Sequence, residues 1–404
     1  MNILILQPWI RVGGAELVSV YLARSLMEQG HDPHIAAVFV DMEDMPGEAA
    51  EVSYILPASR LSNLCSRNRV AFLLLGPLAL FLISLKASAV ADVLNPHNFP
   101  SHWIAAVVGW IRRIPVVWTC NEPPEDISAR DIRSIGLADY LGWLLASSPL
   151  DRIFVRGITA IHVLSERVRE EVNERYGRES RIISAGVNFN TFLSGSAENA
   201  KSKYELDGHF VLLAVGKLHP QKNHIACIEA LSMVRPYLPD PVFLIAGDGP
   251  MRQELERAAT QLNIADAVKF LGRVSMSDLA DLYAVCDINL FPALNQSWGL
   301  TPFEALVAGS ISIVSSDSGA AEVFERIPVG VVAEPDAASL AEAILRIYKS
   351  PEEYSDSVLK GRDYVQANLT NAVYAERLGR FAYEIVQIRS RSKSDIRSVS
   401  EGMR

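Results

Sequence analysis

The chain has 404 residues, of which 49% are hydrophobic and 21% are charged, so it can form more than one globular core. Its formal net charge of -9 argues against nucleic acid as the main partner, because binding to a phosphate backbone requires clustered cations. The cysteines stand far apart without a Cys-x-x-Cys pair, which excludes a recognisable zinc motif and favours reduced thiols in a cytoplasmic setting. They are Cys65, Cys120, Cys227 and Cys286.

In the first half of the chain, short apolar runs alternate with longer segments of helical periodicity. Residues 2–6 predict a first strand and not a signal peptide, because no basic segment precedes them. Residues 15–29 predict a helix that ends at Gly30. Strands that alternate with helices imply parallel βαβ units and a doubly wound sheet. The further strands predicted in this half cover residues 34–40, 52–56, 93–95, 116–119, 160–163 and 181–184.

Residues 70–85 are uncharged and almost wholly apolar, between Arg69 and Lys86. As a helix they would extend about 24 Å, which is short of the roughly 30 Å hydrocarbon core, and Gly76-Pro77 interrupts them. A second apolar patch covers residues 140–150. Both patches fit either buried helices or helices with one face at a membrane surface, and neither favours a membrane span.

After a polar stretch that we expect to be a linker, residues 188–208, the alternation of strands and helices starts again. A helix is predicted over residues 250–261, and the Ser/Arg-rich tail from residue 390 is expected to be disordered. The chain therefore reads as a first domain over residues 1–187 and a second over 209–370. The strands predicted in the second domain cover residues 210–216, 242–247, 268–271, 288–291, 311–315 and 329–332.

Two doubly wound domains in series bind ligands beyond the carboxyl ends of their strands, in a cleft that both domains line. The candidate residues follow strands in this way. Gly13-Gly14 follows the first strand and Gly247 a later one, and such glycines allow close approach of the backbone to a ligand or simply a tight turn. After residues 210–216, Lys217 and Lys222 could hold a diphosphate or be solvated surface lysines.

Residues 294–309 form the most informative stretch of the chain. An apolar strand enters a loop that turns at Gly299, and a helix opens at Thr301-Pro302. The amides there, with the positive end of the helix, suit a phosphate, while Glu304 can bind ligand hydroxyls. The same residues also fit a capping box, in which Glu304 would only satisfy the amides of its own helix.

Polar residues follow two strands of the first domain as well. His97 and Asn98 come after one strand, and Asn121 with Glu122 after the next. A single histidine in such a place is structural more often than catalytic, so His97 stays open as a ligand contact. The backbone of Arg273 and Val274, after a strand of the second domain, could contact a base edge.

Taken together, the chain resembles a retaining glycosyltransferase of the glycosyl transferases group 1 family, over nearly its whole length. The resemblance rests on Gly13-Gly14-Ala15-Glu16, on the segment from Gly216 to Asn223, on Gly247-Asp248-Gly249-Pro250 and on the segment from Gln296 to Glu304. It implies the GT-B fold, in which two Rossmann-like domains face a central cleft. A helix over residues 371–389 would cross back to the first domain.

The resemblance also implies a nucleotide-sugar donor held mainly by the second domain. Lys217 and Lys222 would bind the diphosphate, together with the amides of Leu300 and Thr301. Glu304 would bind the ribose, and Arg273-Val274 the base. Further donor contacts would come from Gly13, Gly14, Gly216, Gly247 and Gly299. Enzymes of this kind need no metal, which agrees with the absence of an Asp-x-Asp triplet.

Two positions depart from the family pattern. Gln296 stands where the family usually has Glu, and Asn121 stands where it often has His. Both are amides, which can bind sugar hydroxyls but do not exchange protons near pH 7. A covalent intermediate on residue 296 is therefore excluded, whereas a front-face transfer remains, with Asn121, Lys222 and Gln296 as the predicted catalytic positions.

The resulting prediction is a hexosyltransferase that uses a UDP- or GDP-sugar and a saccharide or lipid-linked acceptor, in surface polysaccharide or glycolipid synthesis. We expect it in the cytoplasm, with possible peripheral contact to the membrane. One alternative is a nucleotide-sugar-binding protein with little transferase activity, which Gln296 and Asn121 motivate. Another is a different GT-B enzyme such as a sugar-nucleotide 2-epimerase.

Overall fold

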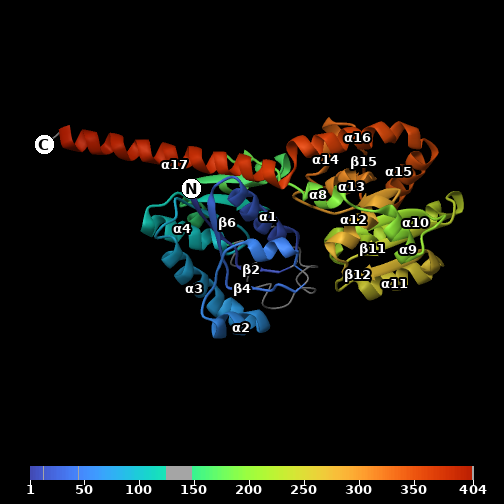
Figure 1. Ribbon diagram of the computed structural model, residues 1–404, viewed down its shortest axis with the longest axis horizontal. Helices are drawn as coiled ribbons and strands as arrows, with labels where there is room; N and C mark the ends of the chain where they lie inside the picture. Colours follow the sequence, from blue (N-terminus) through green and yellow to red (C-terminus); the bar gives the residue numbers. More distant parts are fainter. Residues whose placement is uncertain (12, 44, 124–147, 403–404) are drawn as a thin grey trace. The chain divides into compact units, whose positions relative to one another are not determined.

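The computed structural model describes residues 1–11, 13–43, 45–123 and 148–402 of the chain. The chain divides into two compact units (Figure 1). The N-terminal unit comprises Met1–Ser184 together with Asn371–Arg404, and the C-terminal unit comprises Ala185–Thr370. All four cysteines are buried and free.

The N-terminal unit is built on parallel strands in the order β5-β3-β1-β6, continued by β7-β8-β9. A bridge between Leu94 and Val116 joins the two groups, and the Asn95 side chain adds a 2.7 Å hydrogen bond to the Val117 carbonyl. A short parallel pair, β2-β4, lies beyond β1 and β3. The strands are β1 (Asn2–Leu6), β2 (Trp9–Ile10), β3 (Asp32–Ala36), β4 (Phe39–Val40), β5 (Tyr54–Ile55), β6 (Val93–Pro96), β7 (Val117–Cys120), β8 (Ala160–Val163) and β9 (Arg181–Ile182).

Helices cover both sides of these strands because each has an apolar side to bury. One group of neighbouring helices is α2 (Ser59–Arg67), α3 (Arg69–Ala87), α4 (Ser101–Arg112) and α6 (Pro149–Arg156). Another pair is α1 (Gly14–Glu28) and α17 (Asn371–Gly402), and α7 is Glu166–Tyr176. The core beneath α3 and α4 includes Leu80, Leu94 and Trp118.

A buried carboxylate, Asp151, ties this helical layer together. Its Oδ1 accepts hydrogen bonds from His102 Nε2 and Trp103 Nε1, both at 2.7 Å, and its Oδ2 accepts one from the Tyr176 hydroxyl. Burial alone would raise the pKa of Asp151, but the donors outweigh burial and the pKa is lowered. Three helices, α4, α6 and α7, are therefore fixed around one charge.

The C-terminal unit has a six-stranded parallel sheet in the order β12-β11-β10-β13-β14-β15. The strands are β10 (Phe210–Val215), β11 (Pro241–Ala246), β12 (Val268–Gly272), β13 (Ile288–Phe291), β14 (Ile311–Ser315) and β15 (Val331–Ala333). The helices are α8 (Phe189–Leu193), α9 (Ala197–Tyr204), α10 (His224–Val234), α11 (Arg252–Gln261), α12 (Met276–Val285), α13 (Thr301–Ala308), α14 (Ala321–Arg326), α15 (Ala337–Lys349) and α16 (Pro351–Asn368).

The linker expected over residues 188–208 was wrong, because α8 and α9 occupy it. Phe192 and Ala200 are buried, and the Ser196 amide donates to Asp281 Oδ1 of α12 at 2.7 Å. A few buried side chains and a Ser N-cap were enough to order a stretch that looks polar in the sequence. The chain passes between the units at Ser184/Ala185 and again at Thr370/Asn371, and the Val187 amide donates to the Leu369 carbonyl at 2.8 Å beside these crossings.

The sequence predicts a disordered tail over residues 390–404, whereas the structure describes the backbone of α17 as far as Gly402; residues 403–404 lie outside the described residues. Extending a helix costs far less than starting one, and α17 is started by its packing on α1. Most of the second apolar patch, residues 140–147, lies outside the described residues. The strand predicted over residues 34–40 is divided into β3 and β4, and the other predicted strands and helices of the described residues are present, most with end shifts of a few residues.

Candidate functional site

Each unit's sheet has one position at which its strand order reverses direction, and these positions locate the candidate residues. In the C-terminal unit, strands proceed outward from β10 in both directions, with β11 on one side and β13 on the other. In the N-terminal unit the corresponding neighbours are β1, β3 and β6. Connections leave such a switch point in opposite directions, which opens a crevice at the carboxyl ends of the strands.

The loops after β10, β11 and β12 pack tightly at this edge. The Gly216 amide donates to the Ala246 carbonyl at 3.0 Å, and the Gly247 amide donates to the Gly272 carbonyl at 2.7 Å. Gly247 has φ +146°, and a Cβ on it would lie 1.9 Å from the Gly216 carbonyl oxygen. Only glycine fits there, because the side chain of any other residue would force the two loop backbones apart.

Lys222 and Gln296, which are far apart in sequence, meet at the switch point. Lys222 Nζ donates a hydrogen bond to Gln296 Oε1 and lies 5.7 Å from the centre of the Phe291 ring. The buried side chain of Asn223, next to Lys222, ties the segment after β10 to the loops after β13 and β15. It donates to the carbonyls of Pro292 (3.2 Å) and Pro335 (2.7 Å). Lys217, by contrast, is exposed. The structure thus places one half-buried cation beside the amide that replaces the family's usual carboxylate.

The loop between β13 and α13 is held from both sides. The backbone amide of Asn295, which has φ +47°, donates to Asp317 Oδ2 at 2.7 Å. The backbone carbonyl of Gln296 accepts a hydrogen bond from the Gly319 amide at 2.8 Å. A Cβ on Gly299 would lie 2.6 Å from the Phe291 ring. The loop therefore turns where the sequence predicted, and its course is fixed by glycine and by partners in a neighbouring loop.

Helix α13 begins at Thr301, and no side chain caps its amino end. The first amides of a helix have no partner within the helix. Thr301 Oγ1 is buried near the hydroxyl of Tyr283. A buried hydroxyl beside the helix amides makes this end suitable for a phosphate.

The capping-box interpretation of Glu304 was wrong. Its Oε2 accepts a 2.8 Å hydrogen bond from the hydroxyl of buried Tyr283 in α12, and the N-cap residue is Leu300. Burial raises the pKa of the half-buried Glu304 to about 7, although the Tyr283 bond acts in the opposite direction. Glu304 is thus a desolvated carboxyl group that faces α12 instead of its own helix.

Arg273 and Val274 follow Gly272, which has φ +68° at the end of β12. Because Gly247 donates to the Gly272 carbonyl, their loop lies beside the loop after β11. The predicted donor residues of the C-terminal unit therefore all lie on loops at the carboxyl edge of one sheet, or in the first turn of α13.

Three of the predicted residues belong to the N-terminal unit. Gly13 and Gly14 begin α1, with Gly13 as the N-cap. A Cβ on Gly13 would lie 2.4 Å from Glu16 Oε2, and Oε1 of the same carboxylate accepts a 2.8 Å bond from Trp9 Nε1. Asn121 Nδ2 donates to Asn98 Oδ1 at 3.2 Å, which links the residues that follow β6 and β7.

The switch point of the N-terminal unit contains a residue that the sequence did not single out, Gln7. It follows β1 next to His97, since the His97 amide donates to the Leu6 carbonyl at 2.9 Å. Both side chains are fully buried. Within the described part of the chain, neither amide atom of Gln7 has a hydrogen-bond partner, and neither has His97 Nδ1. The strand register was the missing signal, because it alone places Gln7 beside His97.

The protonation of His97 follows from its neighbours. Asn95 Nδ2 donates to the Val117 carbonyl and to Thr119 Oγ1, so Asn95 Oδ1 is left to accept from His97 Nε2 at 2.9 Å. Burial, helped by His162, lowers the pKa of His97 to about 3. His97 is therefore neutral near pH 7, with its proton on Nε2 and a free acceptor at Nδ1.

Among the described residues, no three His, Cys, Asp or Glu side chains are placed to hold a metal ion together.

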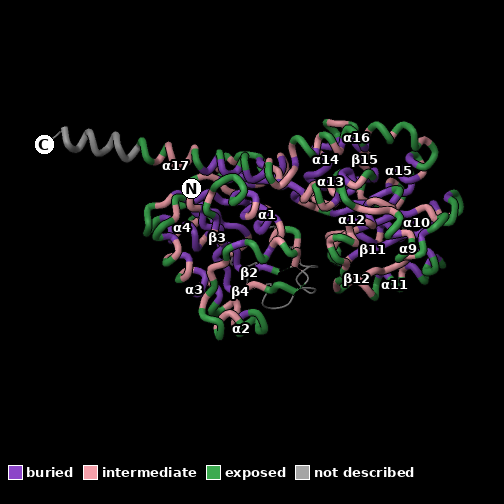
Figure 2. The backbone as a smooth tube through the Cα atoms, viewed as in Figure 1, coloured by how far each residue is buried: buried purple, intermediate pink, exposed green. Residues whose placement is uncertain are grey.

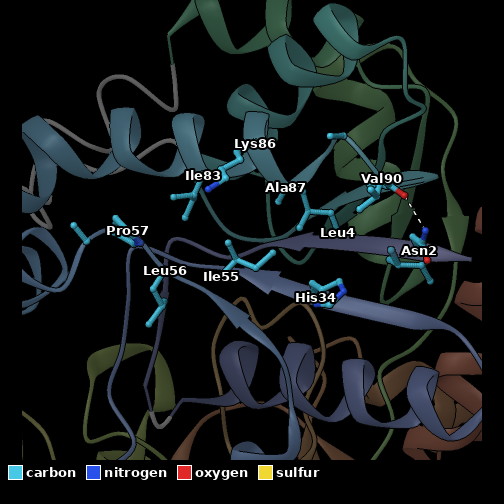
Figure 3. Close-up of a pocket in the computed structure, with 14 residues that line it drawn as sticks. Asn2, Leu4, His34, Ile55, Leu56, Pro57, Ile83, Lys86, Ala87 and Val90 are labelled. Atoms are coloured by element: carbon cyan, nitrogen blue, oxygen red, sulfur yellow. Dashed lines mark hydrogen bonds between the residues drawn. The ribbon is translucent and has the colours of Figure 1, made fainter.

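The N-terminal unit has a cavity of about 480 Å³ away from its switch point. It opens between the carboxyl end of α3 and strands β1, β3 and β5, lined by Leu4, His34, Ile55 and Lys86 among others (Figure 3).

Comparison with known proteins gives matches over nearly the whole chain. Residues 196–363 match the family model "Glycosyl transferases group 1", and residues 12–191 match "Glycosyltransferase Family 4". Alpha-1,3/1,6-mannosyltransferase ALG2 of Homo sapiens is 24% identical, over 95% of this chain and 96% of that protein.

A second relative and a solved structure agree with these matches. The GDP-mannose-dependent monoacylated alpha-(1-6)-phosphatidylinositol monomannoside mannosyltransferase of Corynebacterium glutamicum is 27% identical, over 71% of this chain and 81% of its own length. The crystal structure of Anabaena HepE in complex with UDP and glucose superimposes with a TM-score of 0.75 at 17% identity, covering 95% of this chain and 100% of that one.

The raised pKa of Glu304 predicts how the C-terminal unit responds to pH. Its folded pKa of about 7 exceeds the ordinary glutamate value of 4.5, so the native state binds this proton more tightly than the unfolded chain does. The contribution of Glu304 to stability is therefore complete below pH 4.5 and is lost as the pH rises through 7. At pH 8 we expect Glu304→Gln to raise the free energy of unfolding by about 3 kcal/mol.

Urea denaturation of the wild type and Glu304→Gln at pH 4.5 and pH 8 measures this effect. The two proteins should differ at pH 8 and converge at pH 4.5. Glu342→Gln, an exposed position on α15, is the control and should change neither value. Equal pH dependence of the wild type and Glu304→Gln would contradict the assignment.

Proposed function

The chain belongs to the group 1 glycosyltransferases, and from this we propose that it transfers a hexosyl group from a UDP- or GDP-sugar to a saccharide or lipid-linked acceptor, with retention of anomeric configuration. It has the expected GT-B fold of two Rossmann-like domains, and it is a glycosyltransferase of the EC 2.4 class. We assign it to surface polysaccharide or glycolipid synthesis.

The observation that carries the proposal is the meeting of Lys222 and Gln296 at a switch point, next to the amino end of α13. In our assignment Lys222 and Lys217 neutralise the diphosphate of the donor, and the amides of Leu300 and Thr301 bind its oxygens. Glu304 binds the ribose hydroxyls, and the backbone of Arg273-Val274 contacts the base. The GDP-mannose in one relative's name and the UDP bound by HepE support these two donor classes.

The mechanism that we propose needs no protein nucleophile. As the bond from the sugar to the diphosphate breaks, the leaving oxygen gains negative charge, which Lys222 and α13 stabilise. The same oxygen accepts the proton of the attacking acceptor hydroxyl on the same face of the sugar. Gln296 binds a sugar hydroxyl or orients Lys222, and because these groups supply the charge neutralisation, the scheme requires no metal ion.

For the acceptor, or the sugar being transferred, we propose the switch point of the N-terminal unit. His97 Nδ1 accepts a hydroxyl proton, and the Gln7 amide donates one hydrogen bond and accepts another. Asn98 and Asn121, linked by their own hydrogen bond, extend this row of neutral amides. A buried polar atom without a partner is costly, so ligand hydroxyls would satisfy these groups.

We further propose that the chain works in the cytoplasm, at the inner face of a membrane that carries its acceptor. One described helix, α3, is long and apolar enough to cross a membrane by length and composition alone. Its inner side packs on β1 and β3, which favours a peripheral position over a spanning one.

The function is tested by incubating the purified chain with UDP-, GDP- and ADP-sugars, with and without a membrane extract, and measuring release of the nucleoside diphosphate. We expect release from a UDP- or GDP-sugar that depends on the extract, and retention of the anomeric configuration in the product by NMR. Tight binding without turnover would overturn the proposal, and so would inversion at C2 of the sugar.

Lys222→Ala should weaken binding of the nucleoside diphosphate by about 1.5–3 kcal/mol, because a charge-assisted contact is lost. This corresponds to roughly 10- to 150-fold in the dissociation constant, measured by isothermal titration calorimetry. Lys360→Ala, at an exposed position on α16, should bind as the wild type does. Unchanged affinity in Lys222→Ala would remove the assignment of the donor phosphates.

Gln296→Glu distinguishes a complete front-face site from one that has lost a carboxylate. We expect retention in both proteins and a change in turnover below about tenfold, since the leaving phosphate already accepts the proton. Steady-state rates with the natural donor measure this. A gain above about a hundredfold would show that the native site lacks a group that its chemistry needs.

Gln7→Met keeps the volume of the side chain and removes its amide. We expect the acceptor KM to rise by about 2- to 12-fold, the equivalent of one neutral hydrogen bond, while affinity for the nucleoside diphosphate is unchanged. The substitution removes an unpaired buried amide, so folding should not suffer. Gln366→Met, at an exposed position, is the control, and an unchanged acceptor KM in Gln7→Met would exclude Gln7 from the site.

A further inference from the structure

The outward sides of α3 and α4 form an apolar surface that no described part of the chain covers. On α3, Leu74, Leu78 and Leu82 are 73%, 57% and 55% exposed, and their spacing of four residues places them on one side of the helix. On α4, Trp110 is 81% exposed and Ile111 is also exposed. We call these five residues the α3–α4 face; Figure 2 shows exposed (green) segments on both helices.

The two helices present this face together. They pack side by side, and Arg112 Nη2 of α4 donates to the Leu85 carbonyl of α3 at 2.9 Å. The Asp151 network fixes α4 to α6, where Leu150 and Ile153 are exposed as well. Single exposed apolar residues are normal on a protein surface, but a contiguous group on neighbouring helices marks an interaction site.

The charge of the residues around the α3–α4 face indicates what kind of partner it binds. Between residues 57 and 121 the chain has six basic residues and a single acidic one, Asp92, although its net charge is -9. Four of them stand at the ends of α3 and α4, and Arg60 and Arg67 lie on the neighbouring helix α2. The six basic residues are Arg60, Arg67 and Arg69 on the amino-terminal side, and Lys86, Arg112 and Arg113 on the carboxyl-terminal side. Apolar side chains flanked by cations suit the surface of an anionic bilayer.

The cavity beneath the carboxyl end of α3 adjoins this face. Figure 3 shows Ile83, Lys86 and Ala87 of α3 opposite Leu4 and Ile55 of the strands and Leu56, which follows β5. Lys86 is exposed at the rim of this mainly apolar hollow of about 480 Å³. A phospholipid whose phosphate contacts Lys86 would find apolar side chains on both sides of that cation.

A spanning position for α3 conflicts with its inner side. Gly76, Ala79, Leu80 and Ser84 are buried, and Ala79 and Leu80 belong to the core of the N-terminal unit. Moving α3 into the bilayer would expose that core. A helix with one side packed and the other side apolar belongs at the interface between water and lipid.

We infer that the α3–α4 face docks on the surface of a bilayer that contains anionic phospholipid. The leucines and Trp110 enter the boundary between headgroups and acyl chains, while the flanking arginines and Lys86 contact phosphates. The inference rests on the proposed function only in that a lipid-linked acceptor gives the docking its purpose.

The test measures binding of the purified full-length chain to vesicles of phosphatidylcholine, with or without phosphatidylglycerol, by co-sedimentation. We expect at least tenfold tighter binding to the anionic vesicles, because several basic residues near the surface are attracted to anionic headgroups. Leu74→Ser/Leu78→Ser/Leu82→Ser should weaken binding at least tenfold. Lys86→Glu/Arg113→Glu should remove the preference for anionic vesicles. The matched control, Tyr237→Ser/Leu359→Ser, changes exposed apolar residues of the C-terminal unit and should bind as the wild type does.

A second measurement reports the position of Trp110. Vesicles with brominated acyl chains should quench the tryptophan fluorescence of the wild type, and Trp110→Phe should lose that part of the quenching while still binding. Equal binding of the triple serine variant and its control would overturn the inference. So would equal binding to neutral and anionic vesicles, or resistance to alkaline extraction, which would indicate a spanning helix.

The vesicle experiment contains neither donor nor acceptor, so its failure is separate from failure of the proposed function. A chain that transfers sugar to a soluble acceptor but does not bind vesicles would refute the docking face and the proposed membrane location, and would leave the transferase proposal standing. A chain that binds anionic vesicles but releases no nucleotide with any acceptor would refute only the transferase proposal.

Discussion

The close approach of glycine-bearing loops at the carboxyl edge of a parallel sheet is the constraint on which the C-terminal unit depends. Gly247 lies against the Gly216 carbonyl, and a Cβ on Gly249 would lie 2.4 Å from the Leu218 carbonyl oxygen. These contacts bring the loops after β10 and β11 together, and Asn223 ties the β10 loop to the β13 loop. Lys222 and Gln296 meet only because this backbone arrangement holds, so the chemistry of the site follows from the packing of its loops.

The two units share a switch-point topology, but one switch point is positively charged and the other is neutral. At the C-terminal switch point stand a cation and the positive end of α13, a combination that suits phosphate. At the N-terminal switch point stand the neutral amide of Gln7 and a histidine whose pKa is lowered to about 3. Neutral donors and acceptors suit hydroxyl groups, because burying a second charge there would be costly. The proposed division between donor phosphates and sugar hydroxyls therefore follows the charge of the side chains at each switch point.

The sequence predicted local structure well and spatial neighbours poorly. Strands such as β13 and helices such as α1 follow from apolar periodicity, and the turn at Gly299 follows from its residue types. The role of Glu304 could not be predicted, because its partner Tyr283 lies 21 positions away on another helix. Gln7 was missed for the same reason: strand register, which is a property of the assembled sheet, places it beside His97. Residues 188–208 were misjudged because only a few of their side chains are buried.

The apolar segment over residues 70–85 shows why composition alone could not assign a surface. A helix that is apolar all round has no periodicity to say which side is packed. Packing answers the question, since Leu80 lies in the core while Leu74, Leu78 and Leu82 are exposed. The inner side of the same helix covers β1, and Gln7 directly follows β1. One strand therefore separates the surface suited to lipid from the buried amide suited to a sugar hydroxyl, so both ends of a lipid-linked acceptor have a matching chemistry within the N-terminal unit.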